Sequence, residues 1–155
     1  MTKFDDHPTV KHLREREQNQ TESATTQVLD RDWLKELCLE MGADDVGFVS
    51  IDQSAIAHQR SELLTAFSHT KSLISFVYRM NRENVRNPAR SVANLEFHHT
   101  GEEINTIARK IVRALEAQGV RAINPAMGFP MEAKNFPDKC WVVSHKPVAV
   151  AAGLG

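Results

Sequence analysis

The fold is decided by residues 72–78, which read SLISFVY. β-Branched and aromatic side chains dominate this stretch, and its nearly continuous apolar character predicts a central strand covered on both faces. Upstream, residues 44–51 read DDVGFVSI and predict a second short buried strand. These two β segments form the frame against which the flanking helices are expected to pack.

Apolar residues at helical spacing lie on either side of the first predicted strand. Residues 30–41 predict a helix that Asp30 or Asp32 caps and that Gly42 ends. Residues 56–67 predict a second helix, which joins the two strands.

The strongest helical pattern of the chain precedes Gly119, which is expected to end that helix. Thr100 and Glu103 resemble a capping box, so the helix begins at Gly101 or continues, with a kink, from Ser91.

Two further stretches predict strands, at residues 120–124 and 140–144. The order helix, strand, helix, strand, helix, strand indicates an α/β or α+β layered domain.

Composition indicates one cytoplasmic domain. The chain has 155 residues, a formal net charge of −1 and two cysteines, Cys38 and Cys140. Two distant cysteines form no secreted-type disulfide framework, which favours a reducing compartment. No apolar run approaches the roughly 20 residues of a membrane span, so no membrane partner is expected.

The amino-terminal segment differs from the rest of the chain. Residues 1–28 are polar, with almost no apolar clustering, which predicts a mobile arm; packing on a missing domain or partner is the alternative. Residues 29–155 form the predicted α/β domain.

An arginine-rich segment follows the predicted central strand. Residues 79–90 read RMNRENVRNPAR, and guanidinium groups bind phosphate oxygens bidentately. Ligand crevices in α/β sheets lie at the ends of strands, so Tyr78, Arg79, Asn81 and Arg82 are candidate cofactor-binding residues. The alternative interpretation is a solvated loop.

A proline- and methionine-containing loop, residues 124–139, offers a second candidate surface. Met127 and Gly128 would contact a planar or corrin-like cofactor, although ordinary loop packing explains the same composition. Asp138 is the candidate proton donor, provided that burial raises its pKa.

A metal site is not expected. His98 and Glu102 share a helix face, but their spacing is not that of HExxH, and no third ligand is evident. The interpretation adopted is an exposed polar turn.

Several motifs together resemble one protein family. Residues 145–155 read HKPVAVAAGLG, after CWVVS at 140–144; MGADDVGFVSID at 41–52, SLISFVYRMN at 72–81 and NLEFHHTGEEIN at 94–105 add to the likeness. Over residues 33–155 the chain resembles the epoxyqueuosine-reductase-like iron–sulfur proteins, relatives of the corrinoid reductive dehalogenases.

The resemblance implies a nitroreductase-like cobalamin-binding scaffold followed by a ferredoxin-like domain with two [4Fe–4S] clusters. It implies cobalamin as cofactor, tRNA or a small molecule as substrate, and Asp138 as proton donor. His145 and Lys146 stand where family members usually have Glu-Arg, and Asp138 is displaced by about one residue, which indicates a sister group. Gly153 and Gly155 complete the cofactor-binding candidates.

The cysteine count limits what this chain does alone. A [4Fe–4S] cluster needs four thiolates, so two cysteines cannot hold one. The first hypothesis is therefore an incomplete reductase, inactive without a missing ferredoxin domain or a split partner. The alternatives are a stand-alone, non-catalytic corrinoid- or flavin-binding module and an interaction remnant.

Overall fold

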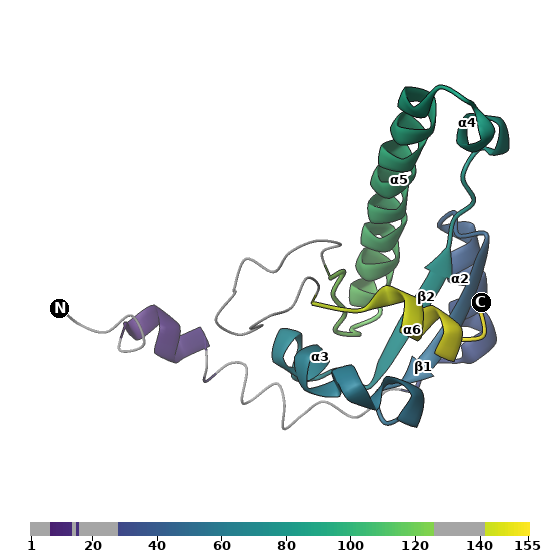
Figure 1. Cartoon of the computed structure of the whole chain (residues 1–155). Helices are drawn as coiled ribbons and strands as arrows, with labels where there is room; N and C mark the ends of the chain where they lie inside the picture. The colour runs from purple at the N-terminus through teal and green to yellow at the C-terminus, as the bar shows by residue number, and fades with distance from the viewer. Residues whose placement is uncertain (1–6, 14, 16–27, 126–141) are drawn as a thin grey trace. The chain divides into compact units, whose positions relative to one another are not determined.

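The computed structural model describes residues 7–13, 15, 28–125 and 142–155 (Figure 1). The chain divides into two compact units, Met1–Asp30 and Arg31–Gly155. In the first unit, residues 8–13 and 15 are helical. Whether residues 1–28 form a mobile arm stays a prediction.

The second unit mixes helices with a small sheet. In chain order its elements are α2 (Arg31–Glu40), β1 (Asp45–Ser50), the 3-10 helix η2 (Ser54–Gln59), α3 (Arg60–Ala66), β2 (Ser72–Val77), α4 (Arg82–Arg86), α5 (Arg90–Ala117) and α6 (His145–Ala151). The helices predicted at 30–41 and 56–67 and both principal strands are confirmed, the second helix with a 3-10 first half.

The sheet is antiparallel and two-stranded in the described part of the chain, so the fold is α+β. β1 pairs with β2 from Asp45 opposite Val77 to Ser50 opposite Ser72. The expectation of a central strand is therefore wrong for β2, whose inner residues are half-buried.

The third predicted strand is also wrong, because residues 120–125 carry no regular secondary structure. They follow a helix end at Gly119, and only Val120 shares in its hydrogen bonding, through Leu115. In the predicted strand at 140–144, residues 142–144 are not a strand, while Cys140 and Trp141 lie outside the described residues.

Helix α5 begins upstream of the predicted capping box. It is one helix from Arg90, so Thr100 lies inside it, and its hydroxyl donates to Glu96 rather than capping a helix end. The short helix α4 occupies the arginine-rich segment, which sequence patterns did not predict as helical.

The two faces of the sheet pack against different helices. Gly47 points toward Ala152 at the end of α6, while the ring of its neighbour Phe48 lies 6.0 Å below the Arg31 guanidinium of α2. Successive side chains of a strand point to opposite faces, so α6 and α2 cover opposite sides of β1. Figure 1 shows α6 crossing one side of the sheet.

The main core lies under α6. A cluster of buried apolar side chains combines β1, the η2–α3 connection and α6: Val49, Ile51, Ile56, Leu63, Val143 and Val148. Full burial of one such side chain contributes about 1.5–3 kcal/mol, so the cluster stabilises the packing of α6 on β1.

A polar contact holds the approach to α6. The side-chain amide of Gln59, which is 5% exposed, accepts from the Ser144 N–H at 3.0 Å and donates to the Ser144 carbonyl at 3.3 Å. The Gln59 amide thus bonds both backbone groups of Ser144, as a neighbouring strand would. Without these bonds the buried amide would destabilise the fold.

Helix α6 ends in a Schellman motif. Gly153 has φ +81°, its N–H donates to Val150, and the Leu154 N–H donates to Ala149. Glycine adopts this left-handed conformation without a Cβ penalty, which explains the glycine at position 153.

Gly47 is expected to tolerate no side chain. A Cβ built there would collide with the backbone carbonyl and Cβ of Ala152, so Gly47→Ala must push α6 away from β1. We expect the free energy of unfolding to fall by about 1–3 kcal/mol, measured by urea denaturation.

Gly101→Ala is the matched control, because no atom lies within 4 Å of a Cβ at that position inside α5. Alanine there should be neutral or stabilising by about 0.5–1 kcal/mol. Equal effects of the two substitutions would contradict the proposed collision.

Candidate functional site

The segment after β2 carries the predicted ligand-binding arginines. Arg79 and Arg82 are exposed. Arg86 follows Arg82 by four residues in the short helix α4. The Arg79 N–H donates to the Asp44 side chain at 2.6 Å, which fixes the backbone and leaves the guanidinium outside.

The charge of these two guanidinium groups is not paired within the described part of the chain. Neither Arg79 nor Arg82 forms an ion pair with a described carboxylate, in contrast to Arg60, which pairs with Asp52 at 2.6 Å. Exposed, uncompensated guanidinium groups are able to bind oxygen-rich anions or amide oxygens.

A buried carboxylate organises this region from inside. Glu96 of α5 is 6% exposed, and its Oε1 accepts from the Asn81 N–H at 2.7 Å. Its Oε2 accepts from the side-chain amides of Asn81 at 3.1 Å and Asn84 at 2.8 Å. The Thr100 hydroxyl adds a longer bond of 3.4 Å to Oε1.

These bonds favour the ionised carboxylate. The Asn81 N–H first, and then the Asn84 and Asn81 amides, hold the pKa of Glu96 below its ordinary value of 4.5. Neutral donors thus compensate a buried charge and join α4 to α5. Asn81, a predicted cofactor-binding residue, donates both its backbone N–H and its side-chain amide to Glu96.

The other predicted site residues fall into three groups. Tyr78 is half-buried just after β2, and Gly153 and Gly155 lie in the turn after α6. Met127, Gly128 and Asp138 lie outside the described residues. No hydrogen bond within the described ranges joins residues 78–82 to Gly153 or Gly155.

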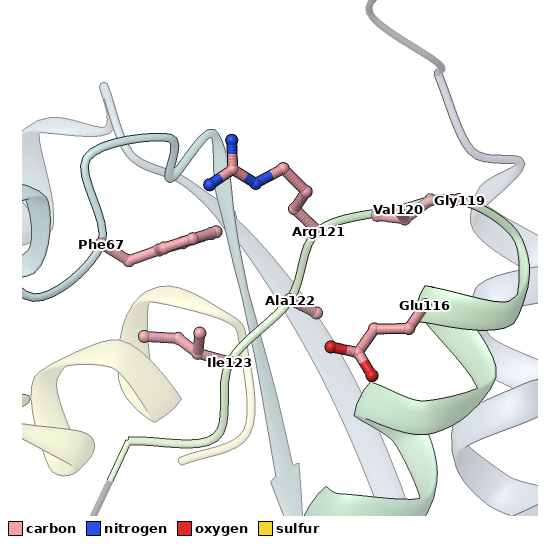
Figure 2. A pocket seen from close by; sticks show the side chains of 7 residues that line it. All are labelled: Phe67, Glu116, Gly119, Val120, Arg121, Ala122 and Ile123. Carbon is pink, nitrogen blue, oxygen red and sulfur yellow. The ribbon is translucent and has the colours of Figure 1, made fainter. Parts of the chain in front are cut away.

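Sequence patterns missed an open hollow at the end of α5. Its lining residues come from the α3–β2 connection, from α5 and from the segment after it: Phe67, Glu116, Gly119, Val120, Arg121, Ala122 and Ile123. Figure 2 shows Arg121 extending toward Phe67 and the Glu116 carboxylate pointing toward Ala122. The expectation of a strand at 120–124 concealed this arrangement.

Metal-ligating residues do not gather in the part of the chain that the structure describes. His98 and Glu102 are both exposed on α5, and no group of three potential ligands occurs among the described residues. Cys38 is fully buried, and this burial raises the pKa of its thiol to about 11.

No family model, curated protein or solved structure matches the chain. The family resemblance therefore depends on the sequence motifs quoted above. No helix within the described ranges is long and apolar enough to cross a membrane.

Glu96→Gln should destabilise the protein at neutral pH. Glutamine would turn an NH₂ group toward the N–H donors of Asn81 and Asn84, which leaves buried donors unsatisfied. The folded-state pKa is lowered, so the stabilisation by Glu96 is full above about pH 4.5 and is lost as the pH falls through the folded pKa.

Thermal unfolding at several pH values tests this expectation. The midpoint of Glu96→Gln should lie below that of the wild type at pH 7, and the gap should narrow below pH 4.5. The control is Glu102→Gln, an exposed position on the same helix. A gap independent of pH would contradict the role assigned to the carboxylate.

Cys38 should resist alkylation in the folded protein. A pKa of about 11 instead of 9.0 lowers the thiolate fraction at pH 8 by about a hundredfold, and burial blocks access as well. We expect iodoacetamide to label a Cys140→Ser variant at least that much more slowly in buffer than in denaturant. Comparable rates would show that α2 opens readily from β1.

Proposed function

We propose that the chain is the amino-terminal portion of a cobalamin-dependent iron–sulfur reductase resembling epoxyqueuosine reductase. Such an enzyme removes oxygen or halide from its substrate reductively. The observation that carries this proposal is the packing of α6: the helix and the Gly153 turn that bear the resemblance lie directly on β1 at Gly47.

The packing supports the proposal because it makes the Ala-rich motif part of the core. Val148 of α6 is buried with Val49 of β1, and the Gln59–Ser144 bonds fix the start of the helix. A nitroreductase-like scaffold is the finer fold that we propose for this α+β unit.

The described residues suit part of a cobalamin site. Arg79 and Arg82 would bind the phosphate and peripheral amide oxygens of the cofactor, since both guanidinium groups are exposed. A Cβ at Gly153 would meet no atom within 4 Å, so open space lies beside that backbone. Bound cobalamin would supply the reduced cobalt that accepts oxygen or halide.

The remaining parts of the proposed enzyme come from elsewhere. Two cysteines cannot hold a [4Fe–4S] cluster, so a ferredoxin-like domain or a split partner would deliver the electrons. Asp138 is the proposed proton donor, with Met127 and Gly128 as further cofactor contacts. The proposed setting is the cytoplasm, with tRNA or a small molecule as substrate.

Titration with cobalamins tests the proposal. Hydroxocobalamin and cyanocobalamin should both bind the purified chain saturably, followed by corrin absorbance and by equilibrium dialysis. Cyanocobalamin is the decisive probe because cyanide occupies the cobalt position that a surface histidine would otherwise ligate.

Variants locate the binding surface. Arg79→Ala combined with Arg82→Ala should weaken cyanocobalamin binding by about tenfold, the loss expected for a charge-assisted hydrogen bond. Arg113→Ala, an exposed residue of α5, is the control and should bind normally. A folded chain that binds no cyanocobalamin overturns the proposal, and FMN binding in its place would support a flavin-binding module.

A further inference from the structure

The hollow at the carboxyl end of α5 has the size of a small-molecule site. Its volume is about 490 Å³, within the range of roughly 300–1,000 Å³ typical of ligand pockets. It opens to solvent, and neither the family resemblance nor the cobalamin proposal uses any of its residues.

A positioned cation lies at one side of the hollow. The Arg121 guanidinium lies 5.6 Å from the centre of the Phe67 ring, a cation–π contact that restricts the arginine side chain. Arg121 forms no ion pair with a carboxylate of the described residues. Its hydrogen-bond donors therefore stay available to an incoming anion, at a reduced entropic cost.

The rest of the lining is largely apolar. Phe67 is half-buried, and Ile123 is 46% exposed although its side chain is aliphatic. Figure 2 shows the Phe67 ring between the Arg121 guanidinium and the Ile123 side chain, with Glu116 on the opposite side of the view. An apolar group placed there would cover both side chains and gain the free energy of their burial.

Glu116 sets a limit on the charge of the occupant. Its carboxylate also lines the hollow, so the site contains one positive and one negative group. A dianion such as a phosphate monoester would gain from Arg121 but be repelled by Glu116. A singly charged carboxylate suffers less of this repulsion, and its two oxygens match the fork of a single guanidinium.

We propose that this hollow binds an organic monocarboxylate with an apolar or aromatic body. The carboxylate accepts hydrogen bonds from the Arg121 guanidinium, and the apolar body lies against Phe67 and Ile123. Arg121 thus provides recognition of the charge, and Glu116 selects against higher negative charge.

Three probes of equal ring size test the proposal on the full chain: phenylacetate, phenyl phosphate and phenethylamine. Amide shifts of Gly119, Arg121 and Ile123 in ¹⁵N-correlated NMR spectra report binding. Phenylacetate should give saturable shifts at these amides, at least several-fold tighter than either of the other compounds.

Two substitutions should act in opposite directions. Arg121→Ala should weaken phenylacetate binding by about tenfold, whereas Glu116→Gln should strengthen it by about two-fold through loss of repulsion. Arg121→Lys, which keeps the charge but lacks the planar fork, should fall between Arg121→Ala and the wild type. Arg90→Ala, an exposed position at the other end of α5, is the control and should change nothing.

Several outcomes would overturn the proposal. They are the absence of saturable shifts, unchanged binding in Arg121→Ala, tighter binding of phenyl phosphate, and tighter binding of phenethylamine. Every substituted residue is exposed. Circular dichroism and thermal midpoints of the variants show whether each one still folds, so weaker binding is not mistaken for unfolding. Cobalamin binding is measured separately, so failure here leaves the Arg79–Arg82 surface unaffected.

Discussion

The close approach of α6 to β1 is the contact on which the rest of the unit depends. It requires Gly47, because any side chain there would collide with Ala152. That approach brings Val148 into the cluster of Val49 and Ile56, where the burial of apolar side chains stabilises the fold. A two-stranded sheet has only marginal stability by itself, so it depends on packing against the helix that covers it.

A second constraint acts where α4 meets α5. Glu96 is buried without a cation, and the amides of α4 provide its compensation. Because those donors are neutral, the arginines of the same segment remain unpaired with described acids and available at the surface. The carboxylate inside and the cations outside are thus consequences of one arrangement of α4 on α5.

Local periodicity identified the principal elements but not their partners. Residues 44–51 and 72–78 have the β-branched composition of strands, yet nothing local says that they pair only with each other in the described structure. Val120 and Ile123 are β-branched, which favours a strand, although no hydrogen bond of a sheet reaches them. Thr100 and Glu103 match a capping box, but the pattern also occurs inside a helix.

The candidate site was less predictable than the fold for a related reason. Arg79 and Arg82 are predictable as ligand-binding candidates because a guanidinium group is able to bind anions wherever it is exposed. The hollow depends on Phe67 and Arg121 meeting across more than fifty intervening residues, and no short motif encodes such a meeting. The hydrogen bond between the Asn81 amide and Glu96 is equally hard to predict, because the two residues lie fifteen positions apart.

The bonds between Gln59 and Ser144 span 85 residues, and the core closes over a similar separation. During synthesis, the whole part of this unit that precedes residue 143 therefore leaves the ribosome before Val143 and Val148 can cover Val49, Ile56 and Leu63. Their native cover arrives only when residues 143–152 emerge. Such a topology concentrates the burial of these side chains into a late step of folding.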